Sequence, residues 1–223
     1  MFKSALMDSW SFFKNHIIIL SLIVLPVVIP FEIASALYQY HFTSVDKGLA
    51  SELLPMSISI LLYPIYSVAV VVYISSVISG NKFTLKELYS ISLKYWGSYL
   101  VITIFIGLIV FGGLMLFIIP GIIFLVRYSF AEFELILNNL KPLDAMSTSW
   151  LSTKNYFITL ISGYAVIAIC LYGPSMALAL NQEEYSVKTY TINTITNIIY
   201  AVLNTFFTIY AYRIYEYSKQ NKT

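Results

Sequence analysis

The chain has 223 residues, of which 59% are hydrophobic and only 11% are charged. A soluble domain carries roughly 25% charged residues, so much of this surface must face lipid rather than water. The net charge of +2 is too small to indicate a nucleic-acid partner. Composition therefore predicts a single integral membrane domain over residues 1–223, with membrane lipids as its surroundings and partners.

Apolar runs long enough to cross a bilayer, which takes about 20 residues, occur along the whole chain. The third run, over residues 95–137, is about twice the length that one spanning helix needs. Its natural break is Pro120-Gly121, because proline interrupts the helical hydrogen-bond ladder and glycine tolerates unusual backbone angles. We therefore predict a turn at Pro120 and Gly121, and an all-α fold of six transmembrane helices. Their expected ranges are 17–40, 53–79, 97–118, 121–138, 157–180 and 190–214.

The positive charges favour six spans with both termini in the cytoplasm. Under this topology the outer side holds only Lys47 and Lys188. A single span over the third run would divide the charges evenly, which the positive-inside rule disfavours. We expect the first run to be a span and not a signal peptide, because Asp8 interrupts its basic flank. The cytoplasmic charges would be Lys3, Lys14, Lys82, Lys86, Lys94, Lys141, Lys154, Arg213, Lys219 and Lys222.

A repeated pattern precedes three of the apolar runs. Residues 4–20 and 144–160 align without gaps and share identical residues such as Trp10 and Trp150. A fainter copy, at residues 88–102, contains Trp96. We interpret the copies as short amphipathic helices at the inner interface, anchored by these tryptophans and each leading into a helical hairpin. The fold would then be three hairpins, although any interfacial helix ahead of a span favours similar residues.

Arg127 is the sharpest candidate for a functional residue. A charge inside a membrane helix costs at least a few kcal/mol unless it is paired or hydrated. Counting about 1.5 Å per residue places Arg127 and Glu32 at a similar depth below the outer face, so we expect them to pair or to share a polar cavity. The pair could fix helix register, or Arg127 could hold a lipid phosphate or another anion. Arg127 could also simply extend toward the interface.

Polar residues form a stripe along the last predicted span, with spacings of four, seven and four. Such a stripe should face inward, either as hydrogen-bonding contacts between helices or as the wall of a hydrated cavity. Glu132 and Glu134 lie near the cytoplasmic end of the fourth predicted span, where either could meet the basic segment 138–156 or water. The stripe comprises Asn193, Asn197, Asn204 and Thr208.

The segment over residues 115–160 resembles the YciC-like family of bacterial inner-membrane proteins. Its pattern is Pro-Gly-Ile after an apolar helix, an arginine six residues after the glycine, and then a Ser-Trp helix before another span. Here these are Pro120, Gly121, Arg127, Ser149 and Trp150. The same pattern is similar to the membrane domain of some glycerophosphodiester phosphodiesterases. The resemblance implies a multi-pass inner-membrane protein connected with the envelope, and it implies no phosphodiesterase activity here.

The sequence offers little for catalysis. His16 and His41 are expected on opposite membrane faces, so they cannot share a metal, and no nucleophile, zinc or phosphate-loop motif occurs. We therefore expect no enzyme, no metal and no cofactor. The first hypothesis is a scaffold or a lipid-interacting envelope factor. The alternatives are a small transporter or channel with a path lined by Arg127, Glu32 and the polar stripe, and a membrane subunit of a larger complex with an unknown protein partner.

Overall fold

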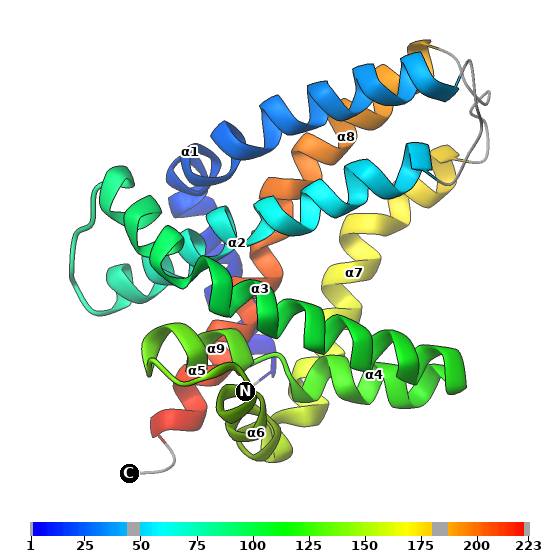
Figure 1. Ribbon diagram of the computed structural model, residues 1–223. Coiled ribbons are helices and arrows are strands. Elements are labelled where there is room, and N and C mark those ends of the chain that lie inside the picture. Colours follow the sequence, from blue (N-terminus) through cyan, green and yellow to red (C-terminus); the bar gives the residue numbers. More distant parts are fainter. Residues whose placement is uncertain (1, 44–49, 180–186, 221–223) are drawn as a thin grey trace.

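The computed structural model describes residues 2–43, 50–179 and 187–220, and these ranges contain helices and no strand (Figure 1). The predicted all-α class is confirmed. Five of the helical segments are long and apolar enough to cross a membrane, which is compatible with a multi-pass membrane protein. The helices are α1 (Phe2–Thr43), α2 (Ala50–Ile78), α3 (Leu85–Leu116), α4 (Ile118–Arg127), α5 (Ala131–Leu137), α6 (Pro142–Ser152), the short 3₁₀ helix η1 (Lys154–Tyr156), α7 (Phe157–Ala179), α8 (Val187–Leu203) and α9 (Thr205–Gln220).

The helices are arranged around α9, which contacts α1, α2 and α7. Helix α1 packs along α8 and α2, and α3 packs between α2 and α4. In Figure 1 the end of α1, the start of α2, the end of α7 and the start of α8 lie together at the upper right. The beginning of α1 and the end of α9 lie in the lower half of the view. Helices α1, α2, α7 and α8 therefore share one end of the molecule, whereas α3 runs across it to meet α4 at the lower right of Figure 1.

The predicted fourth span, residues 121–138, is not one helix. It consists of α4, with ten residues, and α5, with seven, separated by a turn over residues 128–130. At about 1.5 Å per residue neither piece reaches across a core about 30 Å thick. Ser149 bridges the break, because its hydroxyl donates to the Arg127 carbonyl (2.8 Å) and accepts from the Phe130 N–H (3.1 Å). These bonds satisfy backbone groups that the interrupted helix leaves free.

The chain turns at Phe117 and not at the predicted Pro120-Gly121. Phe117 is extended, with φ −157° and ψ 146°, and separates α3 from α4. Pro120 falls in the first turn of α4, where a missing N–H costs nothing. Gly121 serves packing instead, because a Cβ there would come within 2.4 Å of the Leu114 side chain. A Cβ on Gly113 would likewise come within 2.9 Å of the Gly121 backbone, so these two glycines let α3 and α4 lie in close contact.

Only one copy of the repeat forms a short helix that is separate from the long helix after it. Helix α6 is distinct from α7, whereas residues 4–20 lie within α1 and residues 88–102 within α3. Residues 4–20 contain no proline or glycine, and residues 88–102 contain only Gly97. Each segment therefore continues as one helix into the apolar run that follows it. The two stronger copies are nevertheless buried alike. Three matched pairs are fully buried, namely Ala5 with Ala145, Ser9 with Ser149, and Leu20 with Leu160.

Candidate functional site

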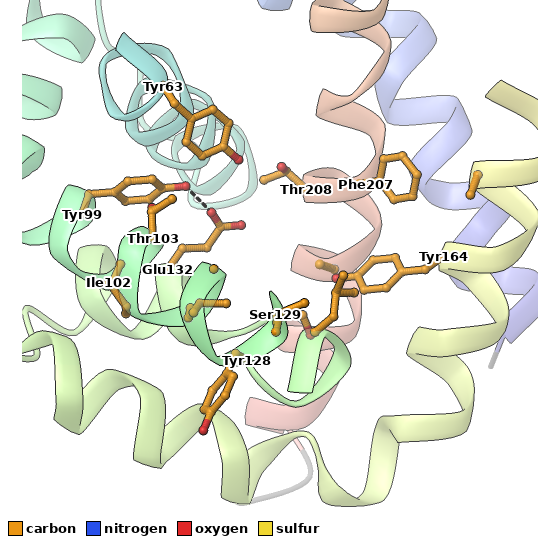
Figure 2. A pocket seen from close by; sticks show the side chains of 16 residues that line it. Tyr63, Tyr99, Ile102, Thr103, Tyr128, Ser129, Glu132, Tyr164, Phe207 and Thr208 are labelled. Atoms are coloured by element: carbon orange, nitrogen blue, oxygen red, sulfur yellow. Dashed lines mark hydrogen bonds between the residues drawn. The ribbon is translucent and has the colours of Figure 1, made fainter. Parts of the chain in front are cut away.

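A cavity of about 680 Å³ lies between α2, α3, α4, α5, α7 and α9. Most of its wall is apolar, and Tyr63, Tyr99 and Thr208 lie around its one carboxylate, that of Glu132 (Figure 2). Pockets that bind small molecules have volumes of about 300–1,000 Å³ and combine apolar walls with a few polar groups. The size and composition of this central cavity are those of a ligand site. Its apolar wall includes Ile102, Ile106, Val110, Leu125, Ala168 and Phe207.

Glu132 is the only charged residue among the described residues that line the central cavity. It extends from α5 into the space between Tyr63, Tyr99 and Thr208, while Tyr128 points away (Figure 2). The Tyr99 hydroxyl donates a hydrogen bond to Oε2 of Glu132. Within the described residues, Oε1 of Glu132 makes no hydrogen bond. One carboxylate oxygen is therefore held by the protein and the other is open to the cavity.

The tyrosines beside Glu132 form an aromatic rim. Tyr63 and Tyr99 lie with ring centroids 6.0 Å apart, and Tyr63 also packs edge-on against Tyr66 at 5.5 Å. On the opposite side of the cavity, Tyr164 packs against Phe207 with centroids 5.8 Å apart. Aromatic contacts of this geometry stabilise the positions of the rings beyond simple area burial. The rim therefore flanks the carboxylate with aromatic rings that pack against one another.

Burial raises the pKa of Glu132 to about 7, partly offset by the hydrogen bond from Tyr99. Helix α5, which carries Glu132, lies outside the five segments long enough to span a membrane. Desolvation disfavours the charged form of a carboxylate, and no cation among the described lining residues compensates for it. Glu132 is thus poised to change its protonation state near neutral pH.

The structure does not bring Arg127 and Glu32 together. The Arg127 guanidinium lies over the Trp150 ring, 4.5 Å from its centroid. The Glu32 carboxylate accepts a hydrogen bond from Asn197 Nδ2 (3.0 Å). The expectation that Arg127 and Glu32 lie at a similar depth assumed that the fourth span is one continuous helix. The break after α4 shows that this assumption is wrong. Arg127 is therefore partnered by an aromatic face, a contact that favours a cation without requiring an acid.

The predicted polar stripe is divided between two helices, because α8 ends at Leu203 and α9 begins at Thr205. Two of its members join helices: Asn197 donates to Glu32 of α1, and Asn204 accepts from the Tyr172 hydroxyl (2.5 Å) of α7. Thr208 lines the central cavity, and Asn193 is exposed. The stripe thus supplies interhelical contacts and one hydroxyl to the cavity wall.

The three predicted tryptophan anchors have different surroundings. Trp10 is half exposed, packs against Phe13 and Phe206, and has Lys14 Nζ 5.7 Å from its ring centroid. The Trp96 indole N–H donates to the Leu61 carbonyl (2.8 Å), which ties α3 to α2. Trp150 lies beneath Arg127, as described above. All three are thus fixed by specific contacts with neighbouring side chains or backbone.

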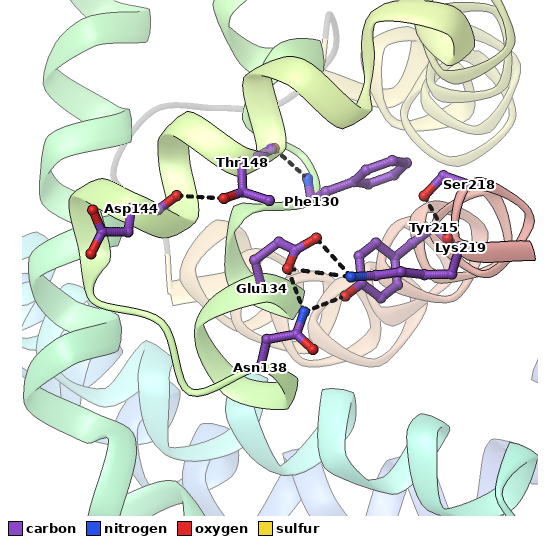
Figure 3. A network of polar contacts seen from close by, with 9 residues as sticks. Phe130, Glu134, Asn138, Asp144, Thr148, Tyr215, Ser218 and Lys219 are labelled. Atoms are coloured by element: carbon purple, nitrogen blue, oxygen red, sulfur yellow. Dashed lines mark hydrogen bonds and ion pairs between the residues drawn. The ribbon is translucent and has the colours of Figure 1, made fainter. Parts of the chain in front are cut away.

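A second acid, Glu134, belongs to a polar network that joins α5 to α9 (Figure 3). Its side chain is buried, with 2% exposed, and Oε1 lies 3.2 Å from Lys219 Nζ. Asn138 Nδ2 donates both to Glu134 and to the Tyr215 hydroxyl, the latter over 3.0 Å. Glu134 thus forms its ion pair with Lys219 in the last described turn of α9, and its contact with the expected segment 138–156 is the hydrogen bond from Asn138. This network is a structural contact that positions α5, and with it Glu132.

Sequence reasoning noted Glu132 but did not place it in a cavity. Tyr63 offered a signal in the sequence, because it lies within an apolar run and its hydroxyl needs a hydrogen-bond partner. The sequence pattern did not predict the turn after α4, and this turn directs Glu132 toward α2 and α3. No group of three or more His, Cys, Asp or Glu side chains in the described ranges could hold a metal ion.

Comparisons with known proteins supply no relative for this chain. No family model, no curated protein and no solved structure matches it. The resemblance to the YciC-like family therefore stays a prediction from the motif over residues 115–160. The functional conclusion rests on the geometry of the central cavity.

Proposed function

We propose that this chain is a non-enzymatic, multi-pass protein of a bacterial inner membrane that binds a lipid in its central cavity. The observation that carries the proposal is the cavity itself, about 680 Å³ in volume, with an apolar wall and one polar end at Glu132. An acyl chain fits the apolar wall, and a headgroup fits the polar end. A lipid-interacting envelope factor is thus better supported than a scaffold, which needs no cavity.

The membrane topology is part of the same proposal. Three pairs of helices, α1 with α2, α3 with α4, and α7 with α8, would form hairpins with both termini in the cytoplasm. The positive-inside pattern supports this arrangement, as does the position of four helix ends at one side in Figure 1. The α3–α4 pair would enter the membrane without α4 completing a span, because α4 has only ten residues.

The transport alternative depended on a polar path lined jointly by Arg127 and Glu32. These residues have separate partners, Trp150 and Asn197, and neither lines the central cavity. We therefore do not propose transport. A membrane subunit of a larger complex finds no specific support in the described surface.

Filling the cavity tests lipid binding directly. Gly107 lines the cavity, and a Cβ there meets nothing within 4 Å, so Gly107→Phe should place its ring in the cavity without distorting α3. Gly112 lies on the same helix, is equally open at Cβ and does not line the cavity, so Gly112→Phe is the matched control. The measurement is native mass spectrometry of lipid retained by the full chain after washing in mild detergent. We expect the wild type and Gly112→Phe to retain lipid and Gly107→Phe to lose it.

Equal retention by all three proteins, or none by the wild type, would contradict the proposal. Circular dichroism of the two variants should match the wild type, which separates loss of lipid from loss of fold.

A further inference from the structure

The charges around the central cavity restrict the headgroup that it can accept. Glu132 is the only charged residue among the described residues that line it, and no lysine, arginine or histidine is among them. An anionic headgroup would place a second negative charge beside this carboxylate without a counter-ion, which is unfavourable in a partly desolvated site. A cationic group would meet the opposite charge at short range.

The open oxygen of Glu132 indicates the kind of cation. Oε2 already accepts from Tyr99, while Oε1 faces the cavity and makes no hydrogen bond within the described part of the chain. A carboxylate only accepts hydrogen bonds, so the matching group must donate. A primary ammonium carries three N–H donors, whereas a quaternary ammonium carries none. A charge-assisted N–H bond to Oε1 is among the stronger hydrogen bonds in proteins.

The aromatic rim adds a second attraction for a cation. Tyr63, Tyr99 and Thr208 surround the carboxylate in Figure 2, and Tyr164 with Phe207 lies across the cavity. The faces of tyrosine and phenylalanine rings attract an ammonium group through their quadrupoles. The tyrosine hydroxyls can accept from N–H donors that Oε1 does not reach.

We propose that the central cavity binds an amphiphile with a primary ammonium group, which donates to Oε1 of Glu132 while the apolar chain lies along the α3 wall. This inference rests on the proposed lipid-binding function and specifies its ligand. Ile102, Ile106 and Val110 follow one another along α3 at helical spacing and give the chain a continuous apolar path. Two sources share this chemistry, namely an aminophospholipid of the membrane and a free long-chain amine.

The test uses dodecylamine as the probe, with dodecanol as a neutral probe of the same chain length. Binding to the full chain in dodecyl maltoside is measured by thermophoresis at pH 8, for the wild type, Glu132→Gln and Asp8→Asn. Asp8 is exposed and does not line the cavity. The substitution Asp8→Asn removes one negative charge, as Glu132→Gln does, and is therefore the charge-matched control. We expect the wild type and Asp8→Asn to prefer dodecylamine over dodecanol by about tenfold, and Glu132→Gln to lose that preference.

Equal affinity for the two probes in the wild type would overturn the ammonium assignment, whatever the variant does. Preference for dodecylamine that survives in Glu132→Gln would overturn the role of Glu132. Either result could coexist with lipid retention that depends on Gly107, so the proposed function would stand. Loss of both probes from the wild type, together with unchanged lipid retention in Gly107→Phe, would remove both proposals.

A second arm separates the two sources of the ammonium group. The full chain is reconstituted in nanodiscs of equal parts phosphatidylethanolamine, phosphatidylcholine and phosphatidylglycerol, then extracted and analysed for retained lipid. Enrichment of phosphatidylethanolamine in the wild type but not in Glu132→Gln supports an aminophospholipid ligand. Preference for dodecylamine without this enrichment supports a free amine. Enrichment of phosphatidylglycerol would overturn the proposal.

Discussion

Glu132 combines three properties at the scale of a single residue. It is partly buried, it is the only charge among the described residues of the cavity wall, and one of its oxygens is held by Tyr99. A glutamate on the protein surface is solvated by water, so its ionisation costs little. The protein therefore keeps a carboxylate where its ionisation is costly, a feature that occurs most often at functional sites.

The raised pKa of Glu132 predicts a pH-dependent stability. Its folded-state pKa of about 7 exceeds the unfolded value of about 4.3, so the folded protein binds this proton more tightly. Stability therefore falls as pH rises from about 4.3 through 7 and stays lower above that range. The surrounding titratable groups, Tyr63 on α2, Tyr99 on α3 and Tyr164 on α7, stay neutral over this interval.

The substitution Glu132→Gln should remove this loss of stability at high pH, because glutamine does not ionise. We expect the variant's free energy of unfolding in detergent, followed by circular dichroism, to equal that of the wild type at pH 4 and to exceed it at pH 8 by about 1–3 kcal/mol after allowance for partial exposure. Asp8→Asn should follow the wild type at both values. A variant indistinguishable from the wild type at pH 8 would show that Glu132 ionises without cost.

At the scale of elements, the break between α4 and α5 determines the site. It converts a predicted span into two short helices and directs Glu132 toward α2 and α3. Composition predicts the apolar runs. The start of α3 also has a local sequence signature, the capping box formed by Thr84 and Glu87. The break itself carries no proline or glycine, because Tyr128, Ser129 and Phe130 form it. Its cause is tertiary, through Ser149 of α6, and a local pattern cannot reveal that.

Ser149→Ala tests this cause. The substitution leaves the Phe130 N–H without its acceptor and removes one donor to the Arg127 carbonyl, so it should cost about 1–3 kcal/mol. Thr153 also donates to that carbonyl (3.1 Å) and limits the loss. Ser147, on the same helix and exposed, provides the control Ser147→Ala, which should change little. Equal thermal midpoints for both variants would contradict the bridging role.

At the scale of the whole molecule, the helices enclose a cavity although the sequence suggested a set of packed hairpins. Hydropathy predicted the helical class and the positions of most long helices, because lipid imposes length and composition on each span. It could not predict the cavity, which depends on how α3, α7 and α9 diverge. The expected Arg127–Glu32 pair failed to form for a related reason, since depth along separate helices does not specify which faces meet.

Photo-crosslinking shows whether a lipid occupies the cavity. The full chain is placed in nanodiscs with a trace of phosphatidylethanolamine that carries a diazirine on its acyl chain, and labelled residues are mapped by mass spectrometry. We expect strong labelling at Ile106 and Val110, which line the cavity, and its loss in Gly107→Phe. Labelling confined to outward-facing residues such as Ile18, which is 74% exposed, with none in the cavity would contradict it.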